Sequence, residues 1–306
     1  MTVITAMRFN QESGGMVADS QGSNIIRKYD LFVKSALLGG KFILGGTGSS
    51  STLNEASKRL SENVYDSKLS TYDNACKLSN ILLEAYREHI NELMHANFGF
   101  GAEEYISGKL ADGTPIGSHV LQSAEGLYHG SDQIGQRNRA NEFVVIGRDE
   151  NDSKIFYVPV VGKPAESTLP FATAGSGYDE ADKVLYDFIK SVPRDDRNNI
   201  DFVNGMAALI RATNRASELN PGVGGIPTIS YFNGEKSRVL PEQDSLLATE
   251  IVKAADGKLI SDTESLQSLE GLLANNADFK AIEEKIFWNK NNYREIMEFL
   301  RGYRVN

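Results

Sequence analysis

Residues 1–20 read MTVITAMRFNQESGGMVADS, and this stretch decides the fold class. From Val3 to Phe9 apolar and polar side chains alternate, which is the period of a half-buried β-strand. The turn-forming stretch from Asn10 to Gly15 follows, and Met16 to Ala18 resume an apolar run. The sequence therefore predicts an N-terminal β-hairpin, with Thr2 just before its first strand.

The rest of the chain predicts strands and helices that alternate in groups. Further strands are expected at 31–38, 41–44, 143–147, 155–158, 169–174, 226–232 and 237–240. Apolar residues three and four apart predict helices at 53–64, 75–94, 180–191, 201–217 and in several stretches after 262. This order predicts an α+β fold, a four-layer αββα sandwich in which helices cover both outer faces of two sheets. It does not fit a doubly wound parallel sheet, where strands and helices alternate one by one.

The domain organisation follows from where this periodicity weakens. Between residues 96 and 141 glycine and polar residues dominate and neither period is clear, which indicates an insertion. We expect one αββα domain over residues 2–260, with the insertion at about 96–141, and a helical extension over residues 261–306.

Composition excludes several classes of protein. The 306 residues carry a net charge of −9 with no run of basic residues, which argues against binding nucleic acid or an acidic membrane surface. The single cysteine, Cys76, excludes an internal disulfide framework and a cysteine-rich metal site. The sequence begins without a basic-then-apolar signal pattern, so we expect a cytoplasmic protein.

Thr2 is the candidate nucleophile. Initiator methionine is normally removed before a small second residue, which would leave threonine at the N-terminus. A threonine hydroxyl needs a neighbouring base, and the α-amino group of the same residue can serve because its pKa lies near 7.7–8.0. Many proteins begin Met-Thr by chance, so the hypothesis depends on the residues that follow.

Three later residues have the chemistry that such a nucleophile needs. A lysine close to a hydroxyl lowers the pKa of that hydroxyl, and an aspartate keeps the lysine charged and oriented, which are the roles expected of Lys34 and Asp19. Gly48 follows a predicted strand and precedes a predicted helix, where a backbone N–H can bind an oxyanion. Taken singly, Asp19 is also typical of a turn and Lys34 of an exposed strand face.

Together these residues resemble the proteasome β-subunit pattern. Counted from Thr2, Lys34 and Gly48 stand at the spacing of that family, and Asp19 comes one residue later. The stretch from Phe143 to Tyr157 is similar to the family's "G-x-D … L-Y" strand pair. Gly175-Ser176-Gly177 is similar to its G-S-G motif, in which the serine supports the N-terminal amine. The resemblance covers residues 2–94 and 141–240.

One motif departs from the family. An R-D-x-x-S-G stretch is usual after the second pair of helices, and residues 214–225 read NRASELNPGVGG, with no aspartate. Ser217 or Asn220 would have to take its place in the hydrogen-bond network around the amine. Met1 must also be lost, because it blocks that amine.

The resemblance implies a threonine-type hydrolase of peptide or amide bonds, with no cofactor and no metal. The catalytic residues that it implies are Thr2, Asp19, Lys34, Gly48, Ser176 and Ser217. It also implies a peptide or protein substrate, a homo-oligomeric ring and an ATP-dependent unfoldase as a partner. Three alternatives stay open: a peptide ligase of connectase type, a small-substrate amidohydrolase, and a catalytically inactive structural subunit.

Rival interpretations of other residues are weaker. The loop at residues 45–52 lacks the Lys-Ser/Thr of a phosphate-binding P-loop and the third glycine of a dinucleotide motif. The four histidines show no metal-ligand spacing, since His89 and His95 would lie on different faces of one helix. Cys76 and Trp288 are most simply packing residues of helices.

Overall fold

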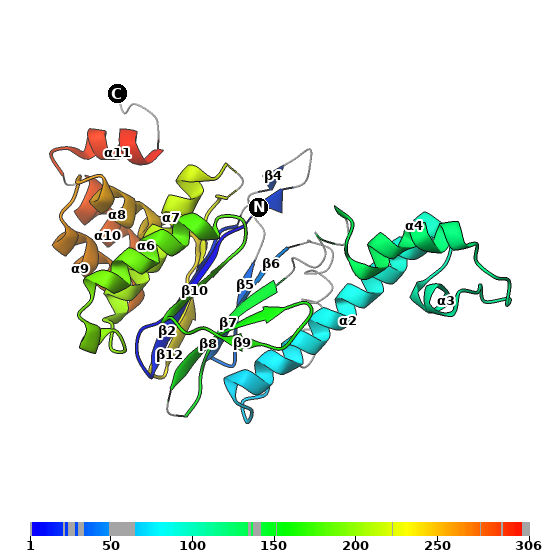
Figure 1. Cartoon of the computed structure of the whole chain (residues 1–306). Coiled ribbons are helices and arrows are strands. Elements are labelled where there is room, and N and C mark those ends of the chain that lie inside the picture. Colours follow the sequence, from blue (N-terminus) through cyan, green and yellow to red (C-terminus); the bar gives the residue numbers. More distant parts are fainter. Residues whose placement is uncertain are drawn as a thin grey trace. The chain divides into compact units, whose positions relative to one another are not determined.

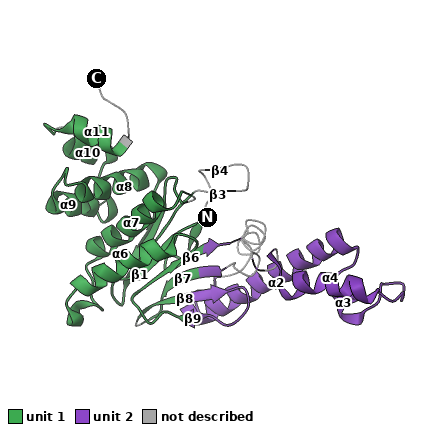
Figure 2. Cartoon of the chain, turned by 45° about the horizontal axis from the view of Figure 1, so that its top comes forward, with its two compact units in different colours: residues 1–45, 144–155, 166–306 green, residues 46–143, 156–165 purple. Residues whose placement is uncertain are grey.

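The computed structural model describes residues 2–20, 22–23, 28–29, 34–48, 65–133, 136, 142–150, 152–221, 223–275, 277–288 and 290–301. The chain divides into two compact units (Figure 2). Unit 1 holds residues 1–45, 144–155 and 166–306, and unit 2 holds residues 46–143 and 156–165. The division passes through strands β6 (Phe42–Thr47), β7 (Glu142–Arg148) and β8 (Ser153–Pro159).

The first sheet lies wholly in unit 1 and begins with the predicted hairpin (Figure 1). Its strand order is β10-β1-β2-β11-β12, and the neighbouring strands are antiparallel. The five strands are β1 (Ile4–Arg8), β2 (Ser13–Ala18), β10 (Phe171–Ala174), β11 (Thr228–Asn233) and β12 (Lys236–Val239). Ile4 is paired with Ala174 on one side and with Ala18 on the other, which fixes what surrounds the N-terminus.

The second sheet has the order β5-β6-β7-β8-β9, where β5 is Ser35–Leu38 and β9 is Ala165–Glu166. Within unit 1 this sheet faces the first one. A Cβ added to Gly45 of β6 would lie 2.8 Å from Met16 Sδ, and one added to Gly14 of β2 would lie 2.5 Å from Ile146 Cδ1. The two sheets thus interdigitate closely, as the sheets of a sandwich do. A separate two-stranded ladder joins β3 (Gly22–Ser23) to β4 (Lys28–Tyr29).

Helices cover the other face of the first sheet. Gly205 of α7 lets the Phe9 ring approach, since a Cβ there would lie 2.3 Å from the ring. The helices of unit 1 are α6 (Tyr178–Ser191), α7 (Phe202–Leu219), α8 (Glu242–Asp256), α9 (Asp262–Leu273), α10 (Phe279–Glu283) and α11 (Tyr293–Arg301). A 3₁₀ turn (Arg194–Asp196) and a π-helical turn (Glu284–Trp288) complete them. One hydrophobic core joins β1, β2 and β11 to α6 through α11.

Unit 2 supplies a long helix and a small helical arm. The long helix α2 (Thr71–Phe98) is capped by the Ser70 side chain, and its Tyr72 ring lies 5.6 Å from the Phe156 ring of β8. The Ser79 hydroxyl donates a hydrogen bond to the Gly162 carbonyl at 3.1 Å. The arm contains α3 (Ala102–Ser107) and α4 (Ser118–His129). The fold class is α+β, with the two sheets and outer helices of an αββα sandwich, as predicted.

Three local features differ from the sequence predictions. Ser13, Gly14 and Gly15 belong to β2 and not to the turn, because these glycines make room for side chains of the opposite layers. The stretch 96–141 contains α3 and α4, and four of its glycines stand at the ends of these helices: Gly101 and Gly117 are N-caps, and Gly108 and Gly130 are left-handed C-caps.

The third difference is helix α8, which the sequence did not predict. The predicted helix at 53–64 and residues 31–33 of the strand predicted at 31–38 lie outside the described residues, and the rest of that strand prediction contains β5. Among the described residues, no helix combines the length and the apolar character needed to cross a membrane.

Candidate active site

The strand pairing around β1 brings distant residues to Thr2. Because β10 and β2 flank β1 in antiparallel register, the residues after Ala174 and after Ala18 lie beside those before Ile4. The Thr2 backbone nitrogen donates a hydrogen bond to Ser176 Oγ at 3.1 Å. Gly177 N donates in turn to the Thr2 carbonyl at 3.1 Å. The turn between β10 and α6 therefore holds Thr2 at both its nitrogen and its carbonyl.

Gly175 is the residue that lets this turn approach Thr2. Its φ is +90°, a left-handed value that side-chain-bearing residues rarely adopt. A Cβ at this position would lie 2.3 Å from the Thr2 carbonyl oxygen and 2.8 Å from the carbonyl carbon. Both the backbone angle and the close contact therefore require glycine.

Asp19 and Lys34 form a buried ion pair on the β2 side of Thr2. Lys34 Nζ lies 2.8 Å from Asp19 Oδ1, and the two side chains are 4% and 2% exposed. The same carboxylate oxygen accepts a hydrogen bond from Val3 N at 2.8 Å. Lys34 directly precedes β5, and Asp19 directly follows β2. Asp19 thus anchors the Lys34 ammonium next to the residue that follows Thr2.

Burial shifts the pKa values of both members of this pair toward their neutral forms. Burial raises the pKa of Asp19, and the contact with Lys34 and the N–H groups of Val3 and Gly224 act in the opposite direction. Burial lowers the pKa of Lys34, and the contact with Asp19 opposes that shift.

The loop after α7 contributes further hydrogen bonds to Ser176 and Asp19. Asn220 Nδ2 donates to the Ser176 carbonyl at 3.0 Å, and Gly224 N donates to Asp19 Oδ2 at 3.3 Å. The Ser217 hydroxyl donates to the Val223 carbonyl at 3.2 Å, inside the same loop. Of the two residues expected to replace the family aspartate, Asn220 contacts Ser176, whereas Ser217 stabilises the loop that binds Asp19.

The structure therefore links five sequence-predicted residues: Ser176 contacts both Thr2 and Asn220, and Asp19 contacts both Lys34 and Val3, the residue that follows Thr2. Gly48 is exposed, with φ of +125°, and belongs to unit 2, so its oxyanion role stays a prediction. Sequence reasoning missed Gly224, which acts through its backbone N–H and so leaves no side-chain signal. Among the described residues, no group of three or more His, Cys, Asp or Glu side chains could hold a metal ion.

The Ser176 contact leads to a prediction. Replacing Ser176 with alanine removes the acceptor for the Thr2 nitrogen, and one such hydrogen bond is worth about 1 kcal/mol. We expect the rate of covalent modification of Thr2 by a β-lactone to fall about fivefold. Intact-mass spectrometry over time measures that rate. Ser191→Ala is the matched control, because among the described residues the Ser191 hydroxyl bonds only to the Phe188 carbonyl, near the end of α6. An equal slowing in both variants would contradict the assigned contact.

Comparisons with known proteins bear on the fold. No protein-family model and no curated protein matches the sequence. Among solved structures, Anbu (ancestral beta-subunit) from Yersinia bercovieri superposes with a TM-score of 0.54 at 14% identity, covering 84% of this chain and 94% of that one. The Anbu (Gly-1) mutant from Hyphomicrobium sp. strain MC1 has a TM-score of 0.48 at 13% identity, covering 79% of this chain and 85% of that one. The Yersinia likeness supports a proteasome-related fold for this chain, as the sequence motifs imply, and it concerns the fold alone.

Proposed function

We propose that this chain is a threonine-type N-terminal-nucleophile hydrolase that cleaves peptide or amide bonds after Met1 is removed. The observation that carries the proposal is the placement of the Thr2 nitrogen on Ser176 Oγ, beside the buried Asp19–Lys34 pair. Removal of Met1 turns that nitrogen into a primary amine, already positioned by a hydrogen bond. An N-terminal threonine needs such an amine as its base.

The reaction would proceed in two stages. The Thr2 hydroxyl oxygen attacks the substrate carbonyl carbon, and its proton passes to the Thr2 α-amine. The Lys34 ammonium stabilises the negative charge that develops near the hydroxyl, and Gly48 N–H is proposed to bind the oxyanion. The substrate C–N bond then breaks, the leaving amine takes the proton from the α-amine, and an ester to Thr2 remains. Water hydrolyses this ester and restores the hydroxyl.

The same ester could be attacked by a second peptide amine, which would make the protein a ligase. Hydrolysis and ligation differ only in the molecule that attacks the ester, water or a peptide amine, and both use every residue named above. Incubating the enzyme with a cleavable peptide and an excess of an amine nucleophile separates them, because a ligase yields the joined peptide and a hydrolase yields the free acid. We place hydrolysis first.

The central prediction concerns Thr2 itself. We expect a β-lactone to form one covalent adduct on protein that has lost Met1 and none on the Thr2→Ala variant, because only Thr2 combines a hydroxyl with a free amine. Peptide mapping by mass spectrometry locates the adduct. Thr263→Ala, an exposed threonine at the start of α9, is the matched control and should react like the unmodified protein.

A sample that retains Met1 on part of its molecules supplies an internal comparison. Only the molecules without Met1 should gain the mass of the adduct, since an amide nitrogen is no base. Equal labelling of both forms, or labelling of Thr2→Ala at the same position, would remove Thr2 as the nucleophile.

A further inference from the structure

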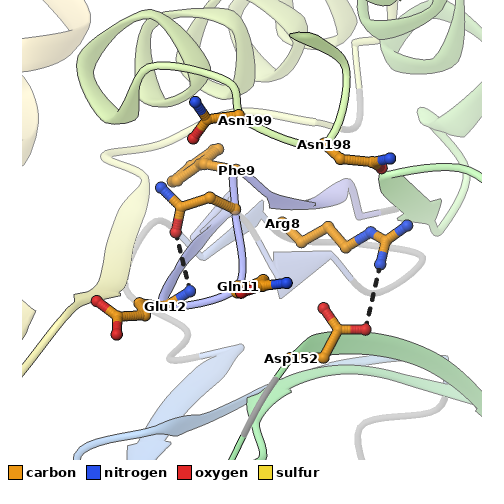
Figure 3. Close-up of a pocket in the computed structure, with 8 residues that line it drawn as sticks. Arg8, Phe9, Gln11, Glu12, Asp152, Asn198 and Asn199 are labelled. Atoms are coloured by element: carbon orange, nitrogen blue, oxygen red, sulfur yellow. Dashed lines mark hydrogen bonds and ion pairs between the residues drawn. The ribbon is translucent and has the colours of Figure 1, made fainter. Parts of the chain in front are cut away.

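A cavity of about 710 Å³ lies in unit 1 at the other end of β1 from Thr2. Three connections form its walls: the β1–β2 turn with Arg8 to Glu12, the β7–β8 turn with Asp152, and the α6–α7 connection with Asn198 and Asn199. Figure 3 shows these side chains around the opening, with the Arg8 guanidinium reaching toward Asp152. Arg8 lies six positions along the chain from Thr2, which is about 20 Å in an extended strand. The cavity is therefore distinct from the candidate active site.

Hydrogen bonds that involve backbone groups hold the walls of the cavity in place. Ile200 N donates to the Phe9 carbonyl at 2.7 Å, which fixes the α6–α7 connection on the first sheet. Ser153 Oγ donates to the Gln11 carbonyl at 2.9 Å, which fixes the β7–β8 turn on the β1–β2 turn. Within the β1–β2 turn, Glu12 N donates to Asn10 Oδ1 at 2.9 Å. The cavity is thus formed without a ligand, as most small-molecule sites are, and its volume is in their usual range.

Apart from Phe9, the side chains that line the cavity are polar. The amides of Gln11, Asn198 and Asn199 are exposed and make no hydrogen bond within the described part of the chain. Each offers two donors and one acceptor. A ligand that fits them must both donate and accept hydrogen bonds at several points, as hydroxyl and amide groups do.

The charges around the opening leave one negative charge in excess. Arg8 Nη1 lies 3.7 Å from Asp152 Oδ2, so those two groups offset each other. The Glu12 carboxylate has no ion pair within the described residues. A cationic group on the ligand would therefore be favoured over an anionic one.

We propose that this cavity binds a small hydrophilic cation, a molecule with one positive charge and several hydroxyl or amide groups. The hydrogen bonds between the three connections give a preformed site. The side-chain amides of Gln11, Asn198 and Asn199 offer hydrogen bonds to the ligand, and the Glu12 carboxylate favours a positive charge on it. The chemistry could come from an amino sugar or from a basic amino acid amide. The site does not depend on Thr2, so its test is independent of the proposed hydrolase activity.

The test is a titration by ligand-observed nuclear magnetic resonance with glucosamine and with L-argininamide as separate probes. At least one of the two probes should bind with a dissociation constant in the millimolar range. If only one binds, it shows whether the site prefers hydroxyl or amide groups. N-acetylglucosamine, which lacks the charge, should bind glucosamine's site more weakly. Binding of neither probe at about 10 mM would overturn the proposal.

Variants then locate the binding. The Glu12→Gln variant should bind the cationic probe with about tenfold lower affinity. The double variant Asn198→Ala and Asn199→Ala should lose affinity by a similar factor. Gln243→Ala, an exposed amide on α8, is the matched control and should leave affinity unchanged, as should Thr2→Ala. Unchanged affinity in both pocket variants would place the binding elsewhere and overturn the assignment.

Discussion

Replacing Lys34 with methionine is expected to lower the free energy of unfolding by about 3–5 kcal/mol, because it leaves the Asp19 carboxylate buried without its cation. The side chains of this pair are 4% and 2% exposed, so water cannot replace the lost partner. The same variant should react with a β-lactone about 10²–10³-fold more slowly, since one preorganised charge near the nucleophile is gone. Urea denaturation and intact-mass kinetics measure the two effects.

Lys183→Met is the matched control for stability. Lys183 Nζ also lies 2.8 Å from a carboxylate oxygen, that of Glu180, but these side chains are 67% and 32% exposed. An exposed pair contributes about 0–1 kcal/mol, so this variant should unfold almost like the parent protein. The two lysine variants share chemistry and distance and differ in burial. Similar losses of stability in both would contradict the role assigned to burial.

The loss of stability in Lys34→Met should depend on pH. Burial already raises the pKa of Asp19, and removing Lys34 takes away the main group that opposes this rise. An acid whose pKa is higher in the folded state binds its proton preferentially there, so stability falls as pH rises through that interval. The variant should therefore be less destabilised at about pH 5 than at about pH 8. The double variant with Asp19→Asn should recover part of the stability and lose this pH dependence.

The sequence predicted most of the architecture because periodicity reports burial. Helix α6 has one buried side, formed by Ala181, Leu185 and Ile189, and this leaves apolar residues four apart in the sequence. Helix α8 leaves no such pattern: residues 247–252 are all buried, since α7, α9, α10 and α11 pack near it. The short helices α3 and α4 were missed because the glycines that end them appeared as breakers throughout the segment.

Within the candidate site, side chains were predictable and backbone contacts were not. The spacing of Asp19 and Lys34 indicated their pairing, and a 2.8 Å contact joins them. Ser176 is 174 residues from Thr2 in the chain, and only its G-S-G surroundings suggested the contact. Gly224 N–H binds Asp19 whatever side chain stands there, so no residue pattern could reveal it. The position of a loop depends on packing over the whole fold, which a local pattern does not contain.

Replacing Gly175 with alanine should abolish most of the reactivity of Thr2 while leaving Thr2 itself unchanged. The new Cβ would lie 2.3 Å from the Thr2 carbonyl oxygen, so the N-terminal residue or the turn must shift. A shift of that kind would break the bonds from Gly177 N to Thr2 and from the Thr2 nitrogen to Ser176. A displacement of about 1 Å at a reacting group can cost about 10²-fold in rate, and we expect β-lactone labelling to slow by at least that factor.

Backbone strain alone must be separated from this displacement, and Gly113 makes that possible. Its φ is +85°, close to the +90° of Gly175, but an added Cβ meets no heavy atom within 4 Å. Gly113→Ala should therefore lose about 1–2 kcal/mol of stability from the left-handed angle and label at the normal rate. If Gly175→Ala also labelled at the normal rate, the turn between β10 and α6 would not position the nucleophile. If both variants labelled slowly, strain and not the contact with Thr2 would be the cause.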